Sequence, residues 1–193
     1  MFYKDDIYSY LEVPYININT KDGERLNNEI KEFVKDYKDT KDDTEDFMVS
    51  YKNFENDNVV SIIIKKTTPS SSTNYYKSIN IDSKTGKELT NSELLKTKKI
   101  DESELSSKLF AVFENQAKED GLIDSYKTMH TYEDEFTSIY DGTKNKIDNN
   151  KLEDYEMYLN SNGDLVVVVE VYFIAGPEKG NKLFNLNTNL YEK

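Results

Sequence analysis

The residue best suited to acid–base catalysis at neutral pH is His130, the only histidine in the chain. Asp134 follows it by four residues, and Ser125 and Ser138 lie nearby in the sequence. A serine nucleophile also needs a tight turn that exposes its hydroxyl group, together with donors for the oxyanion. Because the chain contains no Gly-x-Ser-x-Gly motif, the spacing of these residues does not favour a serine hydrolase.

Carboxylates are the second candidates for chemistry, and they cluster at residues 42–46, 133–135 and 153–156. Two carboxylates cleave glycosidic bonds when strands hold them across a cleft, and the spacing of these clusters does not indicate such a pair. The stretch 141–148 (DGTKNKID) is a weak match to a calcium loop, since it lacks the third ligand, the sixth-position glycine and the twelfth-position glutamate. Solvated acidic loops are the simpler interpretation.

A phosphate or cofactor site is also not indicated. Residues 82–87 (DSKTGK) contain Thr-Gly-Lys but lack the upstream glycine of a phosphate-binding loop, so Gly86 is predicted to be a turn glycine. There is no Gly-x-Gly-x-x-Gly motif and no cysteine, which excludes thiol nucleophiles, disulfides and cysteine-bound zinc. We therefore expect a protein that is not an enzyme and holds no cofactor or metal.

Charge narrows the class of partner. The chain has 37 acidic and 25 basic residues and a net charge of −12, which repels nucleic acids and anionic membrane surfaces and suits a cationic partner. No run of 18 apolar residues exists, so we expect no membrane span within this chain. Because MFYKDDIYSY lacks the apolar segment of a signal peptide, the chain is either cytosolic or a fragment without its leader or anchor.

In the first half of the chain, apolar periodicity predicts one helix and several strands. The alternation in 13–19 predicts a strand, and the apolar stripe in 22–37 predicts a helix. Two runs separated by turn residues predict a hairpin, whose second strand is covered on both faces at Ile62–Ile64. The strands of this region are expected at 47–54, 59–67 and 75–82, with a flexible loop at 69–74.

The second half repeats this order of helix and hairpin. Asp101 and Glu104 are expected to cap a helix at about 102–120, with Gly121 after its end. Asn162-Gly163 lies between apolar runs, a strong hairpin signal, and Leu165–Val169 reads as a central strand. The remaining predicted elements are a short helical turn after Thr90, a helix at 131–140, a polar loop at 141–150, strands at 155–160 and 165–175, a loop at 176–180 and an edge strand at 183–186.

Together these elements predict an α+β fold. We expect two closely packed α/β subdomains, 1–100 and 101–193, in which antiparallel hairpins have helices packed on one face.

Three stretches also have a familiar order and spacing. They are VPYININ at 13–19 followed by NNEI; INID at 79–82 continuing through TGK to ELL; and MYL at 157–159 continuing through GDL to Ala175 and Gly180. They resemble the extracytoplasmic module of RsiV-type anti-sigma factors, which is similar to the N-terminal region of PdaC-type peptidoglycan deacetylases. This resemblance implies an extracytoplasmic, non-catalytic sensing module, anchored at the cell surface in the full-length protein, that binds lysozyme. The family commonly has a glycine-rich, histidine-containing stretch where this chain has Ser70–Tyr76.

The expected partner is therefore a cationic, lysozyme-like protein. The alternative is an accessory domain that binds the glycan of the cell wall. Loop tips beside rigid strands are natural contact points, and tyrosine gives rigid amphipathic contact area, so we place the site at 176–180 and 69–76. The predicted partner-binding residues are Tyr75, Tyr76, Tyr172, Phe173, Gly176, Pro177 and Glu178.

Overall fold

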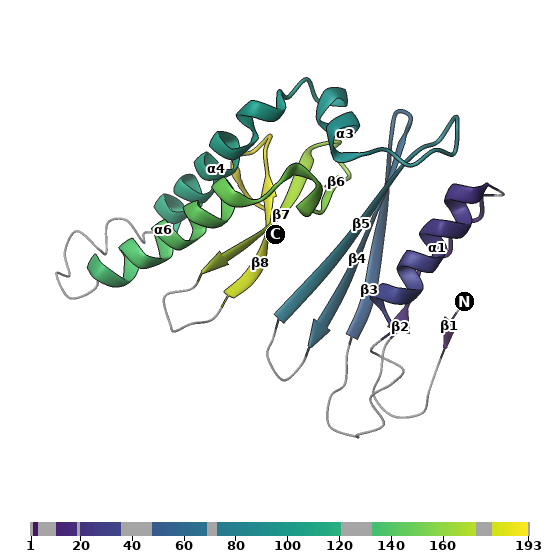
Figure 1. The fold of residues 1–193 in the computed structure, drawn as a ribbon, viewed down its shortest axis with the longest axis horizontal. Helices are drawn as coiled ribbons and strands as arrows, with labels where there is room; N and C mark the ends of the chain where they lie inside the picture. Colours follow the sequence, from purple (N-terminus) through teal and green to yellow (C-terminus); the bar gives the residue numbers. More distant parts are fainter. Residues whose placement is uncertain are drawn as a thin grey trace. The chain divides into compact units, whose positions relative to one another are not determined.

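The computed structural model describes residues 2–3, 11–18, 20–35, 48–68, 73–120, 133–172 and 179–192 (Figure 1). They form an α+β fold with four α-helices and two sheets, as predicted. The chain divides into two compact units, residues 1–90 with 158–163, and residues 91–157 with 164–193. The division lies at residue 90 instead of residue 100, and a segment from late in the chain belongs to the first unit.

The first unit is built on three long antiparallel strands that confirm the predicted hairpins. A two-residue turn, Asp57-Asn58, joins the first two strands, with Asp57 at a φ of 51°. Ile62, Ile63 and Ile64 are all buried, so both faces of the central strand are covered. The strands, in sheet order, are β1 (Phe2–Tyr3), β2 (Leu11–Glu12), β3 (Met48–Asn56), β4 (Val59–Thr68) and β5 (Thr73–Asp82), and β2 runs parallel to β3.

Helix α1 (Lys21–Phe33) lies alongside these strands (Figure 1) and confirms the predicted apolar stripe. The hydroxyl group of Thr20 begins the helix by accepting a hydrogen bond from the Gly23 N–H at 3.2 Å. Leu26 and Ile30 are buried against isoleucines of β4 and β5. Burial of this stripe is the main force that holds the helix on the sheet.

Residues 13–18 form no strand, which corrects the prediction for 13–19; Asn19 lies outside the described residues. Burial alternates as predicted, with Ile16 buried and Tyr15 exposed. The backbone of Ile16, however, is hydrogen-bonded to a side chain: its N–H donates to Asn27 Oδ1, and its carbonyl accepts from Asn27 Nδ2, both at 2.9 Å. The asparagine thus takes the place of a neighbouring strand.

Residues 158–163 pack onto the first unit through buried polar groups. Ser61 is fully buried; its hydroxyl donates to Asn80 Oδ1 at 2.6 Å and accepts from the Leu159 N–H at 3.0 Å. The rings of Phe54 and Tyr158 stack with centroids 5.8 Å apart. Two of these contacts join positions about one hundred residues apart, and the third joins neighbouring strands. Sequence periodicity could not predict them, because it describes only the local pattern along one element.

The second unit contains the other helices and sheet. Strand β7 is buried from Leu165 to Val169, as predicted for a central strand. The elements that follow residue 90 in the chain are α3 (Asn91–Thr97), the 3-10 helix η1 (Glu102–Glu104), α4 (Leu105–Glu119), α6 (Glu133–Asn149), the 3-10 helix η2 (Leu152–Asp154), β6 (Met157–Leu159), β7 (Leu165–Tyr172), β8 (Lys179–Asn185) and β9 (Leu190–Tyr191). Of these, Tyr158 and Leu159 in β6 belong to the first unit. The sheet order is β6-β7-β8-β9, so β8 is not the predicted edge strand, because β9 pairs with its outer side.

The predicted helix after residue 101 is confirmed, with a 3-10 turn as its beginning. Asp101 Oδ1 accepts a hydrogen bond from the Ser103 N–H at 2.8 Å. Glu104 was predicted to cap the helix together with Asp101. It directly precedes α4, and its side chain makes no capping hydrogen bond there. Gly121 lies outside the described residues.

The predicted polar loop at 141–150 is wrong, because α6 continues to Asn149. Thr143 and Ile147 are buried at helical spacing, while Lys144 and Asp148 pair on the exposed side. A straight helix cannot wrap its side chains around an ion, so this stretch is not a calcium loop. Of the helices in the part of the chain that the structure describes, none is long and apolar enough to cross a bilayer.

Tyr155 gives the second unit a pH-sensitive contact. Its buried hydroxyl group donates to the Ile147 carbonyl at 3.1 Å, and burial raises its pKa to about 12. The unfolded phenol titrates near pH 10, so the neutral form stabilises the fold fully below pH 10, and this contribution is lost as the pH rises towards 12. Stability should therefore fall across this window, by at most about 3 kcal/mol from this group.

Urea denaturation from pH 8 to pH 11.5, followed by circular dichroism, checks this prediction. Tyr155→Phe should cost about 1 kcal/mol at pH 8, because one hydrogen bond is lost. It should also lose less stability than the unsubstituted protein between pH 10 and pH 11.5. Equal losses for both proteins in that interval would contradict the assignment.

Candidate functional site

Two of the predicted partner-binding side chains, Tyr75 and Tyr76, are described. Both lie in β5, and consecutive residues of a strand point to opposite faces of the sheet. Tyr75 is 45% exposed, whereas Tyr76 is half-buried. The structure therefore separates the two rings that the prediction grouped. The Tyr172 side chain, Phe173, Gly176, Pro177 and Glu178 lie outside the described residues.

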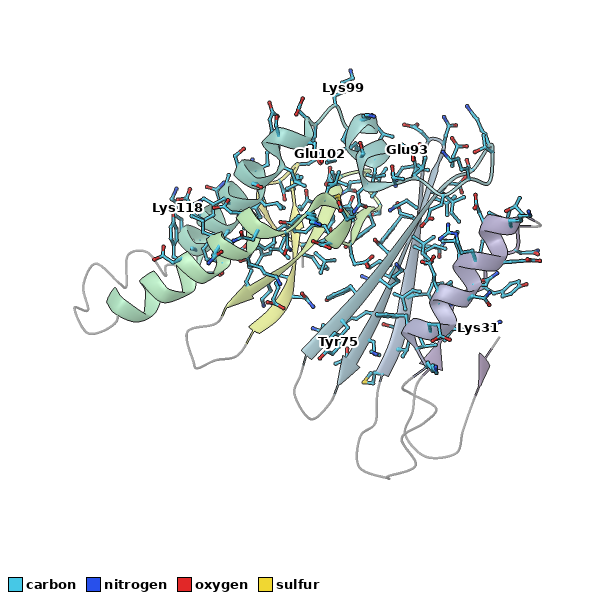
Figure 2. The ribbon with its side chains drawn as sticks, viewed as in Figure 1. Lys31, Tyr75, Glu93, Lys99, Glu102 and Lys118 are labelled. Carbon is cyan, nitrogen blue, oxygen red and sulfur yellow. The ribbon has the colours of Figure 1, made fainter. Side chains whose placement is uncertain are left out.

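Tyr75 belongs to a small cluster around the ammonium group of Lys66, which lies directly opposite it on β4. The Lys66 nitrogen lies 5.6 Å from the centroid of the Tyr75 ring and 5.2 Å from that of Phe33. It also donates to the Phe33 carbonyl at 3.3 Å, at the last residue of α1. A cation is favoured there by both rings and by the negative end of the helix dipole. Figure 2 shows Tyr75 near the start of β5.

The other face of the hairpin carries a matching pair. Lys65 lies directly opposite Tyr76, just as Lys66 lies opposite Tyr75. Burial of the Tyr76 ring raises the pKa of its phenol. Lys65 forms no ion pair with any residue that the structure describes. The hairpin therefore presents one lysine–tyrosine pair on each face.

Next to Lys66, a groove of about 650 Å³ runs between α1 and β5. Its charges form a connected chain: Arg25 pairs with both Glu29 and Glu88, and Lys77 Nζ lies 3.5 Å from Glu29. The groove is lined by Lys21, Glu24, Arg25, Asn28, Glu29, Glu32, Phe33 and Lys77, three of them basic and three acidic. Because its charges balance and pair with one another, this groove does not select a strongly charged ligand.

The turn at 82–87 is closed by its own carboxylate. Asp82 Oδ1 accepts hydrogen bonds from the N–H groups of Lys84 and Thr85 at 2.9 and 2.8 Å. The bond from Thr85 is the main reason that the pKa of Asp82 is lowered. Gly86 has a φ of 69°, as expected of the predicted turn glycine. Asp82 thus occupies donors that a phosphate would need.

The other sequence candidates for chemistry are only partly placed. His130, Ser125 and the acidic run at 42–46 lie outside the described residues. The backbone of Asp134 and Ser138 lies in α6, and nothing is described of their side chains. Within the described ranges, no three histidine, aspartate or glutamate side chains gather in a way that could hold a metal ion.

Sequence reasoning named Tyr75 and Tyr76 but missed Lys65, Lys66 and Phe33. A signal was present, because no acidic residue occurs between Asp57 and Asp82 in a chain that is otherwise rich in them. No family model, curated protein or solved structure matches this chain.

Proposed function

We propose that this protein is a non-catalytic binding module that recognises a cationic protein, with a lysozyme-like enzyme as the expected partner. The net charge of −12 is the observation that carries this proposal. More than half of the negative surplus belongs to the second unit, residues 91–157 and 164–193. The resemblance to RsiV-type anti-sigma factors supports the same partner and an extracytoplasmic location at the cell surface.

Both ends of α4 carry exposed carboxylates that suit such a partner. Asp101, Glu102 and Glu104 precede or begin the helix, and Glu119 and Asp120 end it. Figure 2 labels Glu102 near the start of α4. Hydrogen bonds from Ser103 lower the pKa of Asp101, so this carboxylate stays charged well below neutral pH. Exposed charges of this kind steer a cationic protein into contact and act mainly on the association rate.

Calorimetric titration with hen egg-white lysozyme tests this proposal. We expect measurable heat at micromolar concentrations and an affinity that falls from about 25 mM to about 150 mM salt, because the ions screen the attraction. α-Lactalbumin, which has a similar shape and an acidic surface, is the control and should give no heat. Absence of heat with lysozyme at tens of micromolar and both salt concentrations would refute the partner.

Charge variants separate a specific surface from general attraction. The triple variant Glu102→Gln/Glu104→Gln/Glu119→Gln should weaken binding about tenfold at low salt. The matched control Glu24→Gln/Glu55→Gln/Asp57→Asn removes three exposed carboxylates from the first unit and leaves the same net charge. Equal weakening by both variants would show that net charge alone acts, and the surface at α4 would be rejected.

A further inference from the structure

Another groove of the first unit lies between α1 and the extended segment at 13–18. Its volume is about 610 Å³, within the range of about 300–1,000 Å³ that is usual for ligand pockets. Glu24, Asn28 and Lys31 follow one another at helical spacing and form one wall, and Tyr15 and Asn17, two residues apart on the extended segment, form the other. We call this site the Tyr15 groove; Figure 2 labels Lys31 on its helical wall.

The side chains of the Tyr15 groove are not used by the fold, unlike those of the groove between α1 and β5. In that groove, Glu29 pairs with both Arg25 and Lys77. Five side chains of the Tyr15 groove make no hydrogen bond or ion pair with any residue that the structure describes: those of Tyr15, Asn17, Glu24, Asn28 and Lys31. Their donors and acceptors are therefore available to a ligand.

Tyr15 presents its ring on a backbone that is held in place. It is 71% exposed, more than any other large apolar side chain among the described residues. Its neighbours Pro14 and Ile16 are both buried, and Asn27 holds the Ile16 backbone by two hydrogen bonds. An exposed ring on a fixed backbone loses little conformational freedom on binding, which favours a role in recognition.

We propose that the Tyr15 groove binds an extended, uncharged oligosaccharide. The C–H groups on the flat face of a sugar pack on the Tyr15 ring, and sugar hydroxyls donate and accept hydrogen bonds, as the amides of Asn17 and Asn28 do. Glu24 and Lys31 lie about 10 Å apart along the straight helical wall and carry opposite charges, so the groove has no net charge that would select an ion. This site goes beyond the proposed function, because it consists of other residues and does not need a cationic partner.

The backbone bonds of the extended segment favour a glycan over a peptide. A peptide that binds as an added strand needs a row of unpaired N–H and carbonyl groups along the edge that it joins. On the side that faces α1, the N–H and the carbonyl of Ile16 already bond to Asn27, and the Ile18 carbonyl accepts from the Thr20 N–H at 2.9 Å. The groove therefore offers side-chain groups and no open strand edge, and the net charge of −12 repels a nucleic acid.

Titrations of the full chain with four probes, followed by amide resonances, test this inference. Cellohexaose and mannohexaose are the extended, uncharged sugars, hexagalacturonate is an acidic sugar of equal length, and a capped glycine–serine hexapeptide is the peptide. We expect the uncharged sugars to shift the resonances of residues 15–18 and 24–31, with a dissociation constant on the order of 1 mM. This constant should change less than about twofold between about 25 mM and about 150 mM salt, because no ion pair forms.

Two outcomes of these titrations would overturn the proposal. One is the absence of a saturable shift with both uncharged sugars up to about 10 mM. The other is tighter binding of hexagalacturonate or of the peptide, which would identify an anion site or a peptide site instead.

Substitutions locate the ligand. Tyr15→Ala should weaken binding of the uncharged sugars about fivefold or more, whereas Tyr15→Phe keeps the ring and should stay within about twofold. Asn28→Ala should weaken binding about three- to fivefold, because hydrogen bonds to the sugar are lost. The matched controls are Tyr51→Ala and Asn53→Ala, exposed on β3 and outside the groove, which should change the affinity less than about twofold. Circular dichroism melting of each variant shows whether the fold is kept.

Two further results would reject the groove even if the uncharged sugars bind. Equal loss of affinity in the β3 controls would place the ligand elsewhere on the protein. Unchanged affinity in both Tyr15→Ala and Asn28→Ala would leave the groove without a role in binding. Lysozyme binding should be unchanged in these two variants, and the triple variant at α4 should still bind the sugars, so the two proposals fail or hold separately.

Discussion

Replacing Asn27 with alanine should lower the free energy of unfolding by about 2–5 kcal/mol. The Asn27 side chain is 8% exposed and makes two hydrogen bonds with the backbone of Ile16, each 2.9 Å long. Removing the amide leaves the N–H and the carbonyl of Ile16 without these partners in a buried position. Each unpaired group costs about 1–3 kcal/mol, and the side chain that filled the space is lost as well.

Urea denaturation followed by circular dichroism measures this loss. The neighbouring Asn28 is exposed on the same helix, so Asn28→Ala is the matched control and should stay within about 0.5 kcal/mol of the unsubstituted protein. Asn27→Asp keeps the acceptor for the Ile16 N–H but loses the donor to the Ile16 carbonyl. It should lose at least as much as one hydrogen bond, and its loss should shrink at low pH, where a protonated carboxyl group can donate. Equal stability of the two alanine variants would contradict this account.

The same asparagine explains why 13–18 was mispredicted. Ile16 is buried and Tyr15 is exposed because side chains alternate along an extended backbone. Apolar periodicity in the sequence therefore predicts an extended backbone, but it does not predict what pairs with that backbone. Whether an extended segment is a strand depends on what pairs with its backbone, and the partner here is a side chain eleven residues away. The helices and long strands were predictable because their apolar stripes extend over many residues, as Leu26 and Ile30 show in α1.

The error at 141–150 has a different cause. The segment is almost entirely polar, so it lacks the apolar stripe by which a helix is recognised. Only Thr143 and Ile147 are buried, and the rest of its helical preference comes from pairs such as Lys144–Asp148 on the exposed face. Two buried positions are too few for periodicity to detect.

The candidate site was predictable only in part for a geometric reason. Tyr75 and Tyr76 are adjacent in sequence and were expected to contact a partner together, whereas both lie in β5, within the strand that the sequence predicted at 75–82. In a strand, neighbours in sequence face apart, and residues that share a surface come from the opposite strand or the helix. Lys66 and Phe33 therefore join Tyr75 through strand register and helix packing, which a single sequence does not specify.

Replacing Gly23 with alanine should destabilise the protein by about 3 kcal/mol, near the upper end of the usual cost of overpacking. A Cβ atom at this position would lie 2.3 Å from the carbonyl oxygen of Ile18 and 3.3 Å from its carbonyl carbon. The atoms in the way belong to the backbone, so no side-chain rotation relieves the overlap. Either the start of α1 or the segment at 13–18 has to move, and the hydrogen bonds between Asn27 and Ile16 limit how far that segment can go.

Two controls identify the overlap as the cause. Thr20→Ala removes the cap at the same helix end without adding an atom near Ile18, and should cost about 1 kcal/mol. Gly142→Ala places the same substitution within α6, where helix propensity favours alanine by up to about 1 kcal/mol, so stability should not fall. The Ile18 side chain packs against the turn at Gly86, where it would lie 3.0 Å from an added Cβ atom. Displacement of Ile18 should therefore shift the amide resonances of residues 83–86 in Gly23→Ala and leave them in place in Thr20→Ala. Equal shifts in both variants would contradict this account, because they would show that a weakened start of α1 is enough to displace Ile18.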